Sequence, residues 1–146
     1  MVTLRKAQKK DAGAIRSLIW LVQINPFGLN WRHFLVAVDE HDRLVATGQI
    51  KPHRDGTLEL ASIATHPDFR SQGLASAIIT RLVQDTPHPL YLHCRDVMEP
   101  FYARFGFRSL SIEEMPQSWA RDMRMMDRAR RTVAPNIPRL LVMKLD

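Results

Sequence analysis

SIATHPDFRSQGLA, residues 62–75, runs from the end of a β-rich segment through a turn into an amphipathic helix. A strand–turn–helix junction of this kind directs unpaired backbone N–H groups, and the positive end of a helix dipole, toward whatever lies beyond the helix N-terminus. Gly73 has no side chain, so an anion can approach the backbone closely there, and Arg70 adds a positive charge. The stretch therefore predicts an anion site. An ordinary helix start, with a glycine used for packing, is the alternative interpretation.

The amino-acid composition is that of a folded globular domain. The 146 residues are 45% hydrophobic and 25% charged, which excludes disordered, collagen-like and coiled-coil proteins and predicts one domain over residues 1–146. The longest apolar run, around Ile78 and Ile79, is far shorter than the ~20 residues of a membrane span, and residues 1–10 lack the apolar core of a signal peptide. Cys94 is the only cysteine, so no intrachain disulfide can form and a cytoplasmic location is expected.

The excess of positive charge predicts an anionic partner. Lysine and arginine total 21 against 15 acidic residues, giving a net charge of +6. Nucleic acids, anionic membranes and phosphorylated cofactors would all be attracted to such a chain. Half of this charge falls in one predicted helix, residues 117–131. The same helix carries Trp119, Met123 and Met126 at helical spacing, which is most simply a face packed onto the domain.

Hydrophobic periodicity predicts alternating strands and helices. In chain order they are a strand at 2–5, a helix from Asp11 to Val22, strands at 34–38, 44–50 and 57–65, a helix at 73–84, a strand at 90–93, a helix at 96–106, a strand at 107–112, a helix at 117–131 and a strand at 140–145. This order predicts an α+β fold with a central mixed, mostly antiparallel sheet of about seven strands. Helices flank the sheet, and an extra helix lies between the last two strands.

Residue types also predict local details of the helix starts and of one loop. Asp11 stands where a helix N-cap is expected, and Asp96 with Glu99 three residues later has the pattern of a capping box. Segment 23–31 is expected to be an irregular loop because Pro26 and Gly28 interrupt it. The loop contains four apolar side chains that are expected to be packed against other residues: Ile24, Phe27, Leu29 and Trp31.

Two motifs, in this order, resemble the GNAT superfamily of N-acyltransferases. The first is the family's coenzyme A motif: Arg or Gln, two residues, Gly, one residue, then Gly or Ala. Arg70, Gly73 and Ala75 match it. The second is a helix that carries a tyrosine and ends in Gly-Phe, which residues 101–107 match. The predicted order of strands and helices is also similar to that of the family along the whole chain.

The resemblance implies how acetyl-CoA would bind. Backbone groups of Ile63 and Ala64 would bind the pantetheine arm like an added strand. Backbone groups of the following loop would hold the pyrophosphate: Arg70, Ser71, Gln72, Gly73, Leu74 and Ala75. Arg95 stands where many members have Asn before the tyrosine helix, which departs from the family pattern. Residues 111–136 are longer than the hairpin of many members, and with segment 23–31 they would form walls of the acceptor site.

Acetyl transfer to an amine requires a neutral amine, yet a lysine-like amine with a pKa of ~10.4 is mostly protonated near neutral pH. A general base is therefore useful. Glu59 resembles in position the catalytic glutamate of some members, and its distance along the strand favours action through a water molecule. A glutamate that faces solvent or pairs with a basic neighbour is the alternative, and His93 is the second candidate base.

The departing thiolate of coenzyme A would take a proton from Tyr102, whose phenol stays protonated at neutral pH. The alternative for Tyr102 is a half-buried ring with its hydroxyl bound to the backbone. Cys94 is expected to be a small buried side chain and not a nucleophile.

The expected function is therefore direct transfer of an acetyl group from acetyl-CoA to a primary amine in a ternary complex. The acceptor would be a small molecule or a peptide, preferably neutral or acidic, because a basic wall repels polyamines. No metal is expected, since the six histidines show no metal-ligand spacing. No membrane partner is expected, a homodimer is compatible with the sequence, and nucleic acid is not the expected partner. Two alternatives stay open: a nucleic-acid-binding module that uses the basic helix 117–131, and an acyl-CoA sensor without activity.

Overall fold

The computed structural model describes residues 1–146, which divide into two compact units. Unit 1 consists of Met1–His53 and Leu58–Pro87. Unit 2 consists of Arg54–Thr57 and His88–Asp146.

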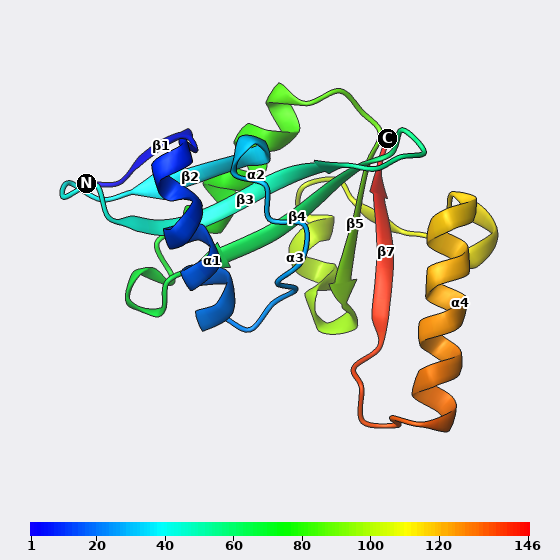
Figure 1. The fold of residues 1–146 in the computed structure, drawn as a ribbon. Coiled ribbons are helices and arrows are strands. Elements are labelled where there is room, and N and C mark those ends of the chain that lie inside the picture. Colours follow the sequence, from blue (N-terminus) through cyan, green and yellow to red (C-terminus); the bar gives the residue numbers. More distant parts are fainter. The chain divides into compact units, whose positions relative to one another are not determined.

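Seven strands and four α-helices make up the chain (Figure 1). The strands are β1 (Thr3–Lys6), β2 (Phe34–Val38), β3 (Leu44–Pro52), β4 (Leu58–Thr65), β5 (Leu90–Arg95), β6 (Arg108–Ser109) and β7 (Leu140–Leu145). The α-helices are α1 (Ala12–Leu21), α2 (Leu74–Asp85), α3 (Glu99–Ala103) and α4 (Gln117–Thr132). Short 3-10 turns are η1 (Lys9–Asp11), η2 (Trp31–His33), η3 (Pro67–Phe69), η4 (Asp96–Met98) and η5 (Ile112–Glu114). The α+β class, the number of strands and the helix between the last two strands are confirmed.

In unit 1, β1, β2, β3 and β4 pair in that order, each antiparallel to the next, as the short connections predict. Helices α1 and α2 cover opposite faces of this sheet (Figure 1). Val36 belongs to a buried cluster with Ile15 and Ile19 of α1. Its neighbour Leu35 points to the other face, where it pairs with Gly48, the residue against which α2 packs.

The absence of a side chain at Gly48 lets α2 pack closely on β3. A Cβ atom there would lie 2.6 Å from Cγ2 of Ile78 and 2.8 Å from Cδ1 of Ile63. We expect Gly48→Ala to lower the free energy of unfolding by about 1–3 kcal/mol, because these branched side chains cannot move away freely. Urea unfolding measures this, with Gly13→Ala on α1 as the control. Nothing lies within 4 Å of a Cβ at Gly13, so that variant should be as stable as the wild type or more so. A Gly48→Ala protein of unchanged stability would contradict the packing described here.

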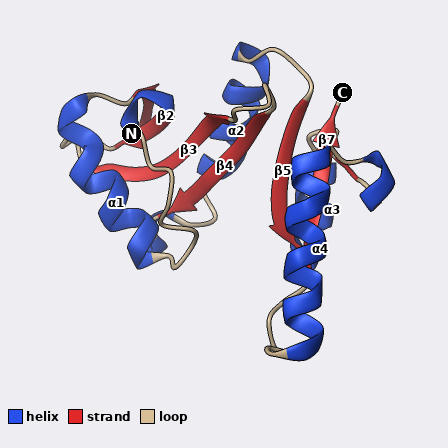
Figure 2. Cartoon of the chain, turned by 45° about the vertical axis from the view of Figure 1, so that its right-hand side comes forward, coloured by secondary structure: helices blue, strands red, loops and turns tan.

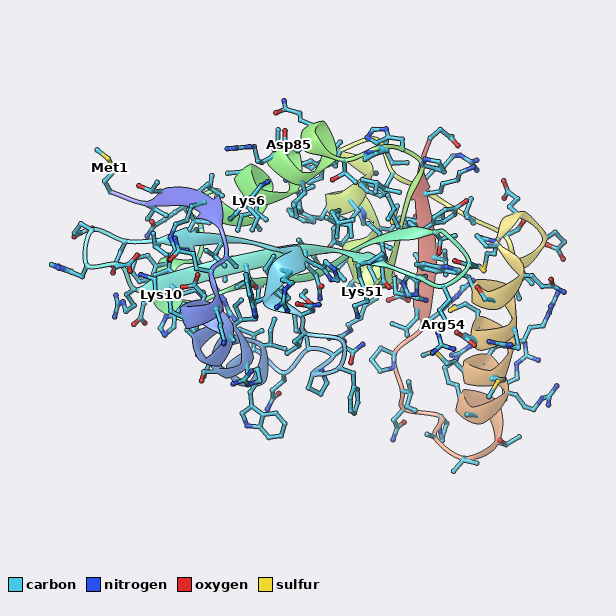
Figure 3. The ribbon with its side chains drawn as sticks, turned by 45° about the horizontal axis from the view of Figure 1, so that its top comes forward. Met1, Lys6, Lys10, Lys51, Arg54 and Asp85 are labelled. Carbon is cyan, nitrogen blue, oxygen red and sulfur yellow. The ribbon has the colours of Figure 1, made fainter.

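Asp11 does not cap α1 in the way the sequence predicts. It is the residue before the helix, but its carboxylate makes no side-chain capping bond to α1. The carboxylate instead accepts hydrogen bonds from Arg5 (Nη1–Oδ2, 2.7 Å) and from the backbone N–H of Gln8 (2.7 Å). The bonds from Arg5 and Gln8 lower the pKa of Asp11, even though burial acts in the opposite direction. Asp11 therefore ties the start of α1 to β1. The nearby Lys10, labelled with Lys6 in Figure 3, pairs with Asp42 at 2.6 Å.

Segment 23–31 is an irregular loop, as predicted, and most of its apolar side chains are covered. Ile24, Leu29 and Trp31 pack against the α1 cluster of unit 1. Phe27 is 76% exposed, so the prediction that the apolar side chains of this loop are buried is wrong for this one residue. The loop is attached to β3 by Gln49, whose Nε2 donates to the carbonyl oxygen of Gly28 at 3.1 Å.

In unit 2, β7 pairs with β5 on one side and with β6 on the other, antiparallel in both cases. Helix α4 runs alongside these strands (Figure 2). The core of this unit contains Tyr91, Leu110, Trp119 and Val142, with Met123 of α4 packed against it. This confirms that Trp119 and Met123 form a packed face of the helix. Met126, by contrast, is 41% exposed.

Two predictions for unit 2 are wrong. The strand expected at 107–112 is reduced to β6, because Ser111 accepts from and donates to Glu114 in a capping box that turns the chain into η5. The capping box expected at Asp96 and Glu99 does not form: the 3-10 turn η4 comes first, α3 begins at Glu99, and the Glu99 carboxylate accepts a hydrogen bond from Ser109 of β6. None of the helices is long and apolar enough to cross a membrane.

Candidate functional site

The loop between β4 and α2 has the conformation that the glycine in its sequence predicts. After η3, where the Nδ1 atom of His66 accepts from the backbone N–H of Asp68 (3.1 Å), two residues adopt left-handed backbone angles. These are Ser71 (φ 64°) and Gly73 (φ 76°). Only glycine adopts this region without strain, and a Cβ at Gly73 would point into open space. The loop therefore leaves the approach to the first turn of α2 clear.

The first turn of α2 presents backbone N–H groups that no side chain caps. The first backbone N–H bonded within the helix is that of Ala77, which donates to the carbonyl oxygen of Gly73 at 3.0 Å. Residues Arg70 to Gly73 are exposed, and Leu74 and Ala75 are half-buried. Uncapped N–H groups together with the helix dipole form an anion-binding arrangement. This is the geometry that residues 62–75 predict, and all of the predicted loop residues lie in it.

Strand β4 carries an irregularity that the sequence does not reveal. The pairing with β3 shifts between Thr47, opposite Ala64, and Gln49, opposite Ala61. Ser62, inside the bulge, has a left-handed φ of 58°, and its hydroxyl accepts from Nε2 of Gln49 at 2.8 Å. The Oε1 atom of Gln49 is buried and has no hydrogen-bond partner. The bulge immediately precedes Ile63, which is half-buried, and Ala64, which is buried.

Glu59 is buried in β4, with 9% of its surface exposed, and it is paired. Its Oε1 lies 2.7 Å from Nε2 of His53. The register of the β3–β4 pair produces this contact, because Lys51 opposes Glu59 and Pro52 opposes Leu58, so that His53 follows directly at the end of the strand. A buried carboxylate next to an imidazole can accept and pass on a proton. Sequence reasoning missed His53, although its position across the Asp55-Gly56 turn from Glu59 is a signal for such a pair.

Tyr102 lies on α3 in unit 2, half-buried among aromatic rings. Its ring contacts Phe101 and Phe107, with centroids 5.1 and 6.3 Å away. Burial, with a smaller contribution from Cys94, raises the pKa of Tyr102 to about 12. Its hydroxyl has no hydrogen-bond partner in the structure, so the alternative of a hydroxyl bound to the backbone is not found. The phenol thus carries a proton at any physiological pH and is able to donate it.

His93 and Cys94, the two other candidate catalytic side chains, also lie in unit 2. His93 stacks on Trp119, with ring centroids 4.4 Å apart, and Nε1 of Trp119 donates to Oγ1 of Thr57 at 3.1 Å. Cys94 is buried, and its Sγ lies 3.7 Å from Sδ of Met143. Burial, with smaller contributions from Glu99 and Asp96, raises the pKa of Cys94 to about 11. A thiol of this kind is a poor nucleophile, in agreement with the prediction from sequence. No cluster of three or more His, Cys, Asp and Glu side chains could hold a metal ion.

A family model matches these elements. The model describes the acetyltransferase (GNAT) family, and it matches residues 4–107, from β1 to the end of the tyrosine motif. The chain belongs to the acetyltransferase (GNAT) family. The matched range covers about 70% of the 146 residues and includes both motifs quoted from the sequence. Acyl-CoA-dependent acyl transfer is the chemistry of this family.

Solved structures share the fold of this GNAT member. N-acetylglutamate synthase from Neisseria gonorrhoeae, complexed with coenzyme A and N-acetyl-glutamate, matches 100% of the chain with a TM-score of 0.75 and 18% identity. The chain spans only 35% of that enzyme's length. Rv2747 from Mycobacterium tuberculosis, solved with CoA, matches with a TM-score of 0.72 and 22% identity over 98% of both chains. A GNAT acetyltransferase from Staphylococcus aureus Mu50 matches with a TM-score of 0.70 and 12% identity over 99% of this chain and 98% of its own.

A substitution at Gly73, in the loop between β4 and α2, tests whether this loop binds an anion. We expect Gly73→Ala to weaken coenzyme A binding at least about 10-fold, since the new Cβ occupies the approach to the backbone N–H groups. A left-handed alanine also costs ~1–2 kcal/mol of unfolding free energy. Gly56→Ala is the matched control, because Gly56 has a φ of 89° and open space around it but lies in the β3–β4 turn. Calorimetric titration with coenzyme A should separate the two variants. Equal affinity in both would contradict a role of this loop in binding the cofactor.

Proposed function

We propose that residues 1–146 act as one acetyl-CoA-dependent N-acetyltransferase that transfers the acetyl group directly to a primary amine. The observation that carries the proposal is the uncapped first turn of α2, which follows the left-handed residues Ser71 and Gly73 and lies inside the range that matches the family. A diphosphate is the natural ligand of such a turn. The structures of two relatives with coenzyme A support this choice of donor.

In the proposed complex, backbone N–H groups from Arg70 to Ala75 hold the pyrophosphate of coenzyme A. Arg70 is exposed beside them and adds a positive charge. Ile63 and Ala64 bind the pantetheine arm through their backbone, as an added strand would. This binding uses main-chain groups, so the side chains of Ser71 and Gln72 contribute little to affinity.

The amine is made nucleophilic by Glu59, which takes its proton directly or through a water molecule. The carboxylate suits this role because it is largely buried and its Oε1 is held by His53 at 2.7 Å. The amine nitrogen then attacks the thioester carbon: a C–N bond forms, the C–S bond breaks, and the electron pair of that bond leaves on sulfur. The nitrogen loses its second proton to become the amide, and this proton replaces the one that Tyr102 gives to the thiolate. His93 is the second candidate for the base.

The thiolate that leaves is protonated by the hydroxyl of Tyr102. Two observations support this role: the phenol has no competing hydrogen-bond partner, and burial raises its pKa to about 12, so that its proton is present when the thiolate forms. The products are an acetylated amine and coenzyme A in its thiol form.

The proposed acceptor is a small molecule or a peptide with a neutral or acidic character. The net charge of +6 disfavours polyamines and basic peptide tails. N-acetyl-glutamate, found with the Neisseria enzyme, is an acetylated acidic amine, and it supports an acceptor of this kind.

The test is release of coenzyme A thiol from acetyl-CoA, measured against a panel of amino acids, peptides, aminoglycosides and polyamines. We expect turnover with an amino acid or a peptide N-terminus, and mass spectrometry should find one added acetyl group on the acceptor. Coenzyme A binding without release with any amine would instead favour the acyl-CoA sensor. Retention on an RNA column that falls steeply with salt, without thiol release, would favour the nucleic-acid-binding module.

A further inference from the structure

Unit 2 contains a cavity of about 430 Å³ between α4 and β7. Its walls are mostly apolar and include Met115, Met123 and Met126 together with Ile137, Leu140 and Leu141. The volume falls within the range of ~300–1,000 Å³ that is typical of small-molecule sites. Methionine side chains are flexible and adapt to the shape of an apolar ligand. The cavity is open to solvent on one side, and it is large enough and apolar enough to hold the body of a small molecule.

Four charged side chains also line the cavity, and together they carry a net positive charge. Asp127 is bound by both Arg130 (Nη2–Oδ1, 3.3 Å) and Arg131 (Nη2–Oδ2, 2.9 Å). Arg139 is the third guanidinium of the lining, and it has no ion pair in the structure. Three cations therefore face one carboxylate beside an apolar wall. A second hollow of about 280 Å³ shares Asp127 and Arg131 with the cavity and adds Arg124 and Arg128.

The cavity includes none of the catalytic or coenzyme A-binding residues of the proposed acetyltransferase, although part of its lining belongs to residues 111–136, which are also expected to form a wall of the acceptor site. Its lining begins at Leu110, beyond the range 4–107 that matches the family, and it includes neither Tyr102 nor His93. It touches the core of unit 2 through Leu110, Val142 and Met123, which pack with Trp119.

We propose that this cavity binds a small molecule that has an apolar body and one carboxylate. The apolar body fills the methionine-lined part, and the carboxylate binds at the arginine-lined rim. A guanidinium has a planar fork of N–H donors that matches the two oxygens of a carboxylate. The contacts of Asp127 show that a carboxylate is accommodated at this rim, because each of its two oxygens is bound by a different arginine. Arg139 and the excess of positive charge are available to a second carboxylate.

The probe is octanoate, with octan-1-ol as the uncharged molecule of equal chain length and acetate as the carboxylate without a tail. We expect calorimetry to show octanoate binding at least 10-fold more tightly than octanol, and no binding of acetate. Arg139→Glu should weaken octanoate binding at least 10-fold. Arg16→Glu, on the exposed side of α1 in unit 1, changes the net charge equally and should leave the affinity unchanged. Leu140→Trp, which fills the apolar part, should abolish binding.

The proposal is overturned if octanol binds as tightly as octanoate. It is also overturned if Arg139→Glu leaves the affinity for octanoate unchanged. A second copy of the chain is the competing occupant: a dimer in sedimentation experiments that excludes octanoate would overturn it as well. Should Leu140→Trp fail to fold, Arg139→Glu and its Arg16→Glu control decide the question. Acetyl-CoA is absent from these titrations, so their outcome is independent of the proposed transferase activity.

Discussion

Tyr102→Phe is expected to lower kcat about 100-fold or more and to change the dissociation constant of coenzyme A less than about twofold. A positioned general acid contributes ~10² to 10⁴ to the rate, and phenylalanine keeps the ring but has no proton to give. The hydroxyl has no hydrogen-bond partner in the structure, so its removal should change the free energy of unfolding by less than ~0.5 kcal/mol. Steady-state kinetics and calorimetric titration with coenzyme A measure the two effects separately.

The pH dependence offers an independent check on Tyr102. Because burial raises its pKa to about 12, the folded enzyme keeps the phenol protonated as the pH rises to 10, and kcat should not fall in that range through loss of this acid. Tyr91→Phe is the matched control, since Tyr91 is a buried tyrosine of β5 in the same unit. A Tyr102→Phe enzyme with the kcat of the wild type would remove Tyr102 from the mechanism. So would an equal loss of rate in Tyr91→Phe.

Features that depend on neighbouring residues could be predicted from the sequence. Helix α2 is expected at 73–84 and occurs at Leu74–Asp85, and Gly73 is left-handed immediately before it, because apolar spacing and one glycine encode both. Helix α4 and strand β7 are equally well predicted, since long periodic segments have few alternatives. The exposed loop before α2 and the uncapped first turn of that helix follow from the same local signals.

Features that depend on a distant strand could not be predicted. Strand β6 is short because the Ser111 and Glu114 capping box competes with pairing to β7, and the apolar residues at 107–112 do not reveal that competition. The expected capping box at Glu99 fails because its carboxylate bonds to Ser109, ten residues away. Likewise, the bulge at Ser62 depends on Gln49 of the neighbouring strand. In the last two cases a side chain finds a partner outside its own segment, whereas the Ser111 and Glu114 spacing is a local signal for a capping box that was present in the sequence.

The candidate site shows the same limit. Sequence reasoning selects Glu59 for its place in β4, but the residue that binds it, His53, becomes visible only when the register of β3 and β4 is known. The Asp55-Gly56 turn implies this register, so the contact between His53 and Glu59 follows once β3 and β4 are paired around it. His53 is a positioning residue in the proposed mechanism, because it acts on the amine only through Glu59.

Glu59→Gln is expected to lower kcat about 100-fold at neutral pH, because glutamine fills the same space but cannot accept the proton of the amine. This loss of kcat should shrink as the pH rises toward the pKa of the acceptor amine, ~7.7–8.0 for a peptide N-terminus and ~10.4 for a lysine-like amine, since the neutral amine is then present without a base. A pH–rate profile of wild type and variant, measured with a saturating acceptor, tests this. Glu113→Gln, at an exposed position in η5, is the control and should keep the full rate.

His53→Ala separates the positioning of Glu59 from its basicity. Loss of the 2.7 Å contact should lower kcat by a smaller factor, about 10-fold, and His53→Gln, which retains an N–H donor, should recover part of it. In the double variant with Glu59→Gln, the two losses should not multiply, because His53 has no carboxylate left to position. A Glu59→Gln deficit that stays constant from neutral pH to pH 10 would show that the carboxylate supports the structure of the site and does not deprotonate the amine, and His93 would then be the base to test.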